Sequence, residues 1–84
     1  MTYEVVATSA AARDIRRLSP EHKERLGRTM LALGEDPRGQ GQKLAVKDAY
    51  RVRVGDYRIV YRVNDGAKRV LVVRIRHHRE VYRR

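Results

Sequence analysis

The hydrophobic positions between residues 50 and 63 alternate with arginines. The segment reads YRVRVGDYRIVYRV, and its apolar side chains recur at every second position on both sides of Gly55-Asp56. A repeat of two is typical of a β-strand, whose successive side chains point to opposite faces of a sheet. Glycine adopts positive φ without steric cost, so Gly55-Asp56 suits a two-residue type I′ or II′ turn. The pattern therefore predicts a β-hairpin over residues 50–63.

The position of the turn sets the register of this hairpin. The predicted cross-strand pairs are Val54 with Tyr57, Arg53 with Arg58, Val52 with Ile59, and Arg51 with Val60. Like charges directly opposite each other destabilise an antiparallel pair by up to about 1 kcal/mol. The facing Arg53 and Arg58 therefore either lie on a solvated outer face or bind an anionic ligand between them. Both interpretations stay open on the evidence of this pair alone.

The first third of the chain predicts a short strand followed by two helices. Residues 2–7 alternate as a strand does, and the hydroxyl residues that follow them suit the N-cap of a helix over residues 8–18. A second helix begins at Ser19-Pro20, because serine caps well and proline fits the first turn. Gly34 is its expected C-cap. The apolar stripes are Ala11, Ile15 and Leu18 in the first helix and Leu26, Met30 and Leu33 in the second.

The second half predicts a loop and one further strand beside the hairpin. Residues 35–42 are rich in glycine, proline and glutamine and show no packing pattern, so we expect a loop there. Leu44 and Val46 are expected to return to the core. A strand over residues 68–77 follows the turn at residues 64–66. By parity, one face of this strand carries Arg74 and Arg76, and the other carries Leu71, Val73 and Ile75.

These elements follow the order strand, helix, helix, strand, strand, strand. We expect an α+β fold in a single domain over residues 1–84, with two N-terminal helices packed on one face of a small, mainly antiparallel twisted sheet of about four strands. The other face would stay uncovered and carry the arginines. Tyr50, Tyr57 and Tyr61 fall on the covered, core-facing side.

Positive charge is concentrated in the half of the chain that forms the predicted sheet. The formal net charge is +10 and the isoelectric point is about 10.9. Residues 50–84 hold eleven Lys and Arg against three Asp and Glu, whereas residues 1–49 hold nine against seven. A strongly basic domain implies an acidic partner, most commonly nucleic acid, and the planar fork of arginine suits phosphate.

Residue types exclude several other kinds of site. The sequence has no cysteine, and His22, His77 and His78 do not have the spacing of metal ligands, so we expect neither a metal nor a cofactor. His22, near the start of the second helix, is expected to be a surface or capping residue. The N-terminal residues lack the pattern of a signal peptide, and no apolar run would span a bilayer. We expect a cytoplasmic protein without membrane contact.

Proton-transfer groups follow the basic face at the end of the chain. The expected face consists of Arg51, Arg53, Arg58 and Arg62 on the hairpin with Arg74 and Arg76 on the last strand. The tail adds His77, His78 and Tyr82 close to Arg76 and Arg79. Because arginine stays protonated, only the two imidazoles and the phenol there are candidates for proton transfer if RNA is cut. Alternatively, the histidines end the strand and the tyrosine anchors the tail.

The order and spacing of these motifs resemble those of RelE-family toxins, the ribosome-dependent mRNA interferases of type II toxin–antitoxin systems. The resemblance rests on the hairpin YRVRVGDYRIVYRV, the apolar strand after it, the ending HHREVYRR and the opening TYEVVATSAAARDIRRLSP. It spans essentially the whole chain. The resemblance implies an endoribonuclease that enters the ribosomal A site and cleaves mRNA there, by attack of a ribose 2′-hydroxyl on the adjacent phosphate.

The resemblance also implies roles for individual residues. Arg58 would match an arginine that contacts phosphate, and Tyr82 would match a C-terminal tyrosine at the substrate nucleotide. His77 falls where relatives have histidine or lysine. Where many relatives read Gly-His-Arg, this chain reads Arg76-His77-His78, so His78 replaces the usual arginine; we therefore take His77 or Tyr82 as the base and His78 as the acid. The expected contacts to mRNA phosphates and rRNA are Arg51, Arg53, Arg62, Arg76 and Arg79.

Partners follow from the same resemblance. We expect a cognate, RelB-like antitoxin, the ribosomal A site with mRNA and 16S rRNA, and DNA only indirectly through the antitoxin. A ParE-like toxin that poisons DNA gyrase without nuclease activity is the first rival, and the histidines and Tyr82 argue against it because gyrase poisoning needs no proton-transfer groups. A non-catalytic RNA-binding module is the second. It would normally expose aromatic residues for stacking, whereas the hairpin tyrosines are expected to face the core.

Overall fold

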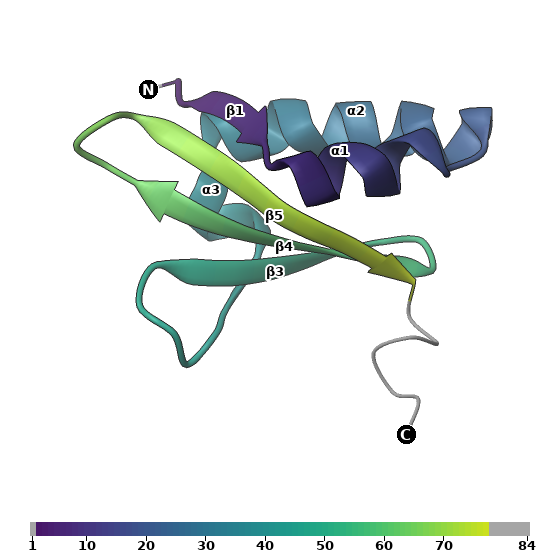
Figure 1. Cartoon of the computed structure of the whole chain (residues 1–84). Coiled ribbons are helices and arrows are strands. Elements are labelled where there is room, and N and C mark those ends of the chain that lie inside the picture. Colours follow the sequence, from purple (N-terminus) through teal and green to yellow (C-terminus); the bar gives the residue numbers. More distant parts are fainter. Residues whose placement is uncertain (1, 78–84) are drawn as a thin grey trace.

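Two helices cover one face of a mixed sheet in the computed structural model, which describes residues 2–77 (Figure 1). The strands form one sheet of five in the order β1-β5-β4-β3-β2, in which β1 runs parallel to β5 and the other pairs are antiparallel. The predicted α+β arrangement is confirmed, with the two-residue β2 as an additional strand. The elements in chain order are β1 (Glu4–Ala7), α1 (Ser9–Arg16), α2 (Pro20–Glu35), α3 (Pro37–Gln40), β2 (Gln42–Lys43), β3 (Ala49–Val54), β4 (Tyr57–Asn64) and β5 (Arg69–His77).

The β3–β4 hairpin has the predicted register at every pair. Val54 lies opposite Tyr57, and Arg53 lies opposite Arg58. Of the two turn residues, only Gly55 has positive φ, at 60°. A positive φ at the first central position alone is the signature of a type II′ turn, which decides between the two predicted turn types.

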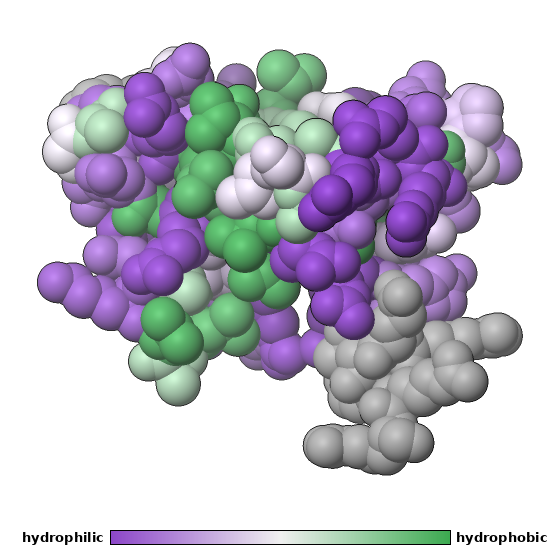
Figure 2. Space-filling view, in the orientation of Figure 1, coloured by the Kyte–Doolittle hydropathy of each residue, from purple (hydrophilic) through white to green (hydrophobic). Residues whose placement is uncertain are grey.

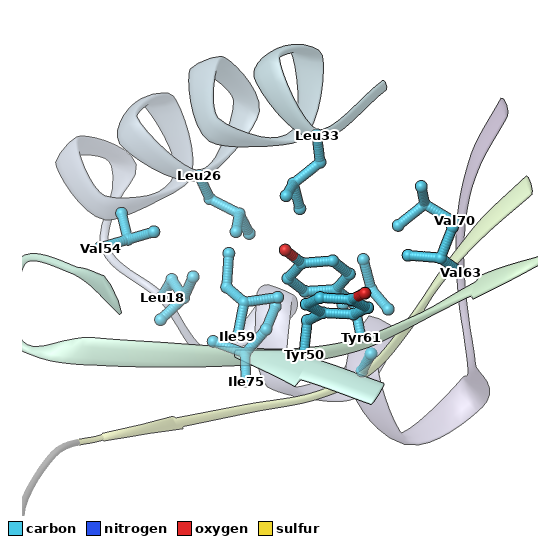
Figure 3. Close-up of a cluster of buried hydrophobic side chains, with 12 residues drawn as sticks. Leu18, Leu26, Leu33, Tyr50, Val54, Ile59, Tyr61, Val63, Val70 and Ile75 are labelled. Carbon is cyan, nitrogen blue, oxygen red and sulfur yellow. The ribbon is translucent and has the colours of Figure 1, made fainter. Parts of the chain in front are cut away.

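The core lies between α2 and the covered face of the sheet. Leu26 and Leu33 point from α2 toward Tyr50 and Tyr61, whose rings stack with centroids 5.7 Å apart (Figure 3). Tyr61 is completely buried, and its hydroxyl donates a 2.5 Å hydrogen bond to the carbonyl of Pro37. Burial raises the pKa of Tyr61 to about 12. The phenol therefore stays a neutral donor, as a buried hydroxyl with a fixed acceptor requires.

Both predicted helices form, but the segment after α2 differs from the prediction. Thr8 and Ser19 cap α1 and α2 with their side-chain oxygens. Gly34 is not the C-cap of α2, because the helix continues to Glu35 and the carbonyl of Gly34 accepts a 2.6 Å hydrogen bond from the N–H of Tyr3. The expected loop instead contains α3 and β2. Val46 does not return to the core, since it is 57% exposed.

A β-bulge in β5 overturns the predicted faces of that strand. Val72 lies opposite Tyr61 and Arg74 lies opposite Val60, so Val73 is an extra residue in the ladder. The covered face therefore takes Val72 before the bulge and Ile75 after it. A repeat of two cannot anticipate a bulge, because one inserted residue reverses the parity of all that follow. The prediction that Leu71 and Val73 share a face with Ile75 is wrong, since both are only half-buried.

Asp14 on α1 closes the edge of β5 where β1 ends. The β1–β5 pairing stops at Val72, and beyond it the carboxylate of Asp14 accepts hydrogen bonds from the N–H of Ile75 (2.9 Å) and from Nε of Arg74 (2.9 Å). Burial on its own would raise the pKa of Asp14, but these hydrogen bonds and the charges of Arg74 and Arg76 hold it below its usual range. The contact joins the first helix to the last strand.

A second ionic contact ties α3 to the turn between β4 and β5. Arg38 donates two hydrogen bonds to Asp65, of 2.8 and 2.9 Å, and its Nε donates to the hydroxyl of Tyr50. Tyr3 donates a 2.6 Å hydrogen bond to the same carboxylate. The hydrogen bonds from Arg38 and Tyr3 lower the pKa of Asp65 to about 2.

Within residues 2–77, none of the helices combines the length and the hydrophobicity that a membrane span requires.

Replacing Gly41 by alanine is expected to lower the free energy of unfolding by about 1–3 kcal/mol, the usual cost of overfilling a packed site. A Cβ at this position would overlap the hydroxyl of Tyr61 and lie 2.7 Å from the carbonyl oxygen of Arg51. Gly27→Ala is the matched control, because its Cβ would meet nothing within 4 Å on α2. The control should raise stability by about 0.5–1 kcal/mol in urea unfolding. Equal effects of the two changes would contradict the packing at Gly41.

Asp14→Asn is expected to lower the free energy of unfolding by about 1–3 kcal/mol at neutral pH, because Arg74 and the N–H of Ile75 lose a charged acceptor. The pKa of Asp14 is lowered in the folded protein, so its contribution is present above the unfolded-state pKa of about 4 and is lost as the pH falls through the lower folded-state value. Unfolding curves in a pH series measure this effect. The gap between the two proteins should narrow below about pH 4, and a gap that stays constant would contradict the assignment.

Candidate functional site

Three arginines lie side by side across the central strands of the sheet. Arg58 on β4 is directly opposite Arg53 on β3 and directly opposite Arg76 on β5. We call these three residues the arginine row. By register they belong to the face away from the helices, because they alternate with the core residues Val54, Ile59 and Ile75. The predicted pair of facing arginines is thus part of a set of three.

Burial differs along the arginine row. Arg53 is exposed, whereas Arg58 at the centre is only 7% exposed. Like charges on directly opposite residues disfavour each other in an antiparallel sheet. An anion above the row would offset this repulsion, and arginine offers several N–H groups with which to bind it. The row is therefore suited to a phosphate.

A hollow of about 340 Å³ lies beside the arginine row. Arg51, Arg53 and Arg58 line it together with residues 40–42. Gln42 orients Arg51, because its side-chain oxygen accepts hydrogen bonds from Nε (3.2 Å) and Nη2 (3.1 Å) of that guanidinium. The volume is in the lower range of small-ligand pockets. Arg51 and Arg53 are thus where the sequence prediction placed them, and Gln42 is a site residue that it missed.

Arg62 is not part of this cluster. Its Nη2 donates a 3.1 Å hydrogen bond to the carbonyl of Lys47, and its side chain lines a different hollow with Arg69 and Leu71. It lies four positions beyond Arg58 on β4, which is about 13 Å along an extended strand. In the view of Figure 2, an apolar band crosses the molecule with hydrophilic side chains on both sides. Arg62 thus lies in a different hollow from Arg51, Arg53 and Arg58.

His77 lies on the other side of the sheet from the arginine row. It is directly opposite Tyr57, and the two rings meet edge to face with centroids 5.1 Å apart. Tyr57 packs against the core under the helices, so its cross-strand neighbour lies on the helix side. The structure therefore does not bring His77 together with Arg53 and Arg58. The predicted site residues His78, Arg79 and Tyr82 lie outside the described residues.

His22 also contacts Tyr57, which the sequence analysis missed. The two rings have centroids 4.9 Å apart, and Nδ1 of His22 is 2.8 Å from the hydroxyl of Ser19. The spacing of Ser19 and His22, three residues apart at a helix start, was the available signal for the hydroxyl contact. Tyr57 thus lies between an imidazole from α2 and one from β5. No pattern in the sequence pairs these two histidines.

Comparison with known proteins identifies the family. The model of the ParE toxin of type II toxin–antitoxin systems (parDE) matches residues 5–82. Toxin RelG of Mycobacterium tuberculosis H37Rv is 30% identical over the whole of both chains, and toxin RelE of the same strain is 32% identical over 96% of this chain and 87% of its own. The chain belongs to the RelE/ParE family of type II toxins. The resemblance noted in the sequence is therefore confirmed.

The fold agrees with this family assignment. A chain of the crystal structure of the toxin–antitoxin complex RelBE2 from Mycobacterium tuberculosis superposes with a TM-score of 0.83 at 28% identity, and the match covers 92% of both chains. That family member was crystallised together with an antitoxin. The chain described here is accordingly a toxin of a type II toxin–antitoxin system.

If the arginine row contacts three phosphates of single-stranded RNA, the logarithm of the binding constant should fall with the logarithm of the salt concentration, with a slope of about −2. Arg53→Gln and Arg58→Gln should each reduce the magnitude of that slope by about 0.7, because each removes one phosphate contact. Arg28→Gln on α2 is the control, since Arg28 pairs with Glu24 away from the row and should leave the slope unchanged. Fluorescence anisotropy over a salt series measures all four proteins. Equal slopes for all four would exclude the row from the RNA interface.

Proposed function

We propose that this toxin is an endoribonuclease that cleaves mRNA in the ribosomal A site and thereby stops translation. The observation that carries the proposal is the arginine row, with Arg58 buried between Arg53 and Arg76. A family toxin that only bound a protein target would not need three arginines in register on the open sheet face, next to the hairpin turn. Relatives named RelE and RelG support the same conclusion.

The arginine row would hold the phosphate at which cleavage occurs. In the proposed reaction, a base removes the proton of the ribose 2′-hydroxyl, the oxygen attacks the adjacent phosphorus, and the bond from phosphorus to the 5′-oxygen breaks. An acid then protonates that leaving oxygen. Negative charge on the phosphoryl oxygens grows during the attack, and fixed guanidiniums stabilise it most at that stage. Arg58 is the central residue for this role because its neighbours and its burial fix its position.

The proton-transfer groups are assigned to the end of the chain. We propose that His77 or Tyr82 acts as the base and His78 as the acid, with Arg79 among the contacts to RNA. His77 follows Arg76 at the end of β5 but lies on the other side of the sheet from the row, so as the base it would act at the edge of β5. Arg51 and Arg62 would contact the mRNA or 16S rRNA to either side. Action on ribosomes implies the cytoplasm as the place of action.

A cognate antitoxin of the RelB type is the proposed partner. The similar chain from Mycobacterium tuberculosis was crystallised in a toxin–antitoxin complex. The charge of this chain, +10 overall, favours an acidic or amphipathic antitoxin segment that neutralises the open face. Any contact with DNA would then be made by the antitoxin.

Poisoning of DNA gyrase is the second candidate. The family model that matches the chain bears the name of the ParE toxin, and this match favours the alternative. Gyrase poisoning does not depend on a site for RNA phosphate. The two candidates therefore differ in their dependence on Arg58.

Addition of the purified protein to a translating cell-free extract distinguishes the candidates. We expect mRNA 5′ ends in phase with codons, and only when ribosomes are present. Arg58→Gln should reduce the cleavage rate by about 100-fold, the usual cost of losing one preorganised donor at a developing oxyanion. Arg28→Gln should cleave at the wild-type rate.

Two further variants test the proton-transfer assignment. Tyr82→Phe and His78→Ala should each slow cleavage by more than about tenfold, as for groups that transfer protons. Wild-type rates in both variants would remove these residues from the mechanism. Intact mRNA together with accumulating gyrase–DNA cleavage complexes would overturn the nuclease proposal in favour of the second candidate.

A further inference from the structure

A second hollow lies at the end of β5, on the helix side of the sheet, and the proposed function does not use it. It has a volume of about 270 Å³ and opens between α1 and the tip of the hairpin. We call it the helix-side hollow. The residues that matter for its chemistry are Arg17, Leu18, Tyr57, Ile75, Arg76 and His77.

The helix-side hollow exists because β1 is short. The pairing of β1 with β5 ends at Val72, so the last residues of β5 form an edge that faces α1 instead of another strand. Asp14 also lines the hollow, but its carboxylate accepts hydrogen bonds from Arg74 and from the N–H of Ile75 and is mostly buried. The negative charge at this edge is thereby compensated. Among the described residues that line the hollow, the other charged side chains are the arginines Arg17, Arg74 and Arg76.

The helix-side hollow combines an apolar wall with cationic groups. Leu18 and Ile75 are buried, and Tyr57 fixes one side because its ring is in contact with both His22 and His77. Arg17 is the C-cap of α1 and is exposed. Apolar and aromatic side chains beside an exposed guanidinium match the two parts of a nucleotide, a flat base and a phosphate.

Arg76 connects the helix-side hollow with the arginine row. By register it lies opposite Arg58 in the row, and it also lines the hollow. A polyanion bound along the row therefore meets the hollow as soon as it passes the edge of β5. The shared residue makes the two sites continuous for a chain with regularly spaced phosphates.

We propose that the helix-side hollow binds one nucleotide of the single-stranded RNA, next to the phosphate held by the arginine row. Leu18, Tyr57 and Ile75 contact the base, and Arg17 with Arg76 binds its phosphate. His77, which also lines the hollow, then faces the ribose that joins the base to the phosphate. The inference rests on the proposed nuclease function for the identity of the ligand, and it assigns to the helix side of the sheet a contact with substrate that the open face alone does not provide.

Adenosine 3′-monophosphate is the probe for this site, titrated into the full-length protein with methyl groups observed by NMR. The Leu18 and Ile75 methyl signals should shift in a saturable manner, and inorganic phosphate alone should shift them less. Arg17→Gln should weaken the affinity read from these signals about tenfold, within the range for one charge-assisted hydrogen bond. Arg16→Gln is the matched control, because it removes the same charge one residue earlier on α1, and it should change the affinity less than about twofold.

The two variants separate a built site from general attraction. Equal weakening by Arg16→Gln and Arg17→Gln would overturn the proposal, as would stationary Leu18 and Ile75 signals, whether or not Val60 on the open face shifts. The methyl spectrum without probe reports whether each variant is folded. Saturable binding in the helix-side hollow by a protein that cleaves no mRNA would support the nucleotide site and reject the nuclease function. Cleavage of mRNA without binding in the hollow would support the nuclease function and reject the nucleotide site.

Discussion

The register of the β3–β4 hairpin decides which face of the sheet carries positive charge. A shift by one residue would turn Arg53 and Arg58 toward the core and Val52 and Ile59 toward solvent. The type II′ turn at Gly55 excludes that shift, because its twist matches only one pairing of the flanking strands. Every cluster described on the open face depends on this constraint. A local choice of turn residue therefore determines a property of the whole surface.

Opposite charges lie at the margins of the sheet. Asp14 binds Arg74 at one edge of the sheet, and Asp65 binds Arg38 at the turn between β4 and β5. Asp14 also interacts with the charge of Arg76, at the β5 end of the arginine row. These two acidic residues thus fasten helices to the sheet.

Regular patterns made most of the fold predictable. Alternation gave the hairpin register, and helical spacing gave the buried stripes that end in Leu18 and Leu33. Prediction failed where one residue interrupts a pattern, as Val73 does in β5, because parity after a bulge is reversed. It also failed for short elements such as α3, whose four residues carry no measurable periodicity.

The candidate site was predictable in composition but not in arrangement. The sequence identified Arg51, Arg53 and Arg58 and their shared face, because strand parity holds along the hairpin. Alternation separates His77 from Arg76, but it does not show that the ring of His77 meets Tyr57 on the helix side. Side-chain contacts between different elements, such as that of Gln42 with Arg51, cannot be predicted from hydrophobic periodicity.

The close approach of Gly41 to Tyr61 has a consequence for ligand binding. The hydroxyl of Tyr61 donates a hydrogen bond to the carbonyl of Pro37, and the absence of a side chain at Gly41 lets the chain pass close to that hydroxyl. The segment that presents Gln42 is thereby fastened to the core on both sides of α3. A wall that is rigid before the ligand arrives loses little conformational entropy when it binds. The hollow beside the arginine row is thus preorganised, so a phosphate bound there under the proposed function would keep more of the guanidinium attraction as net affinity.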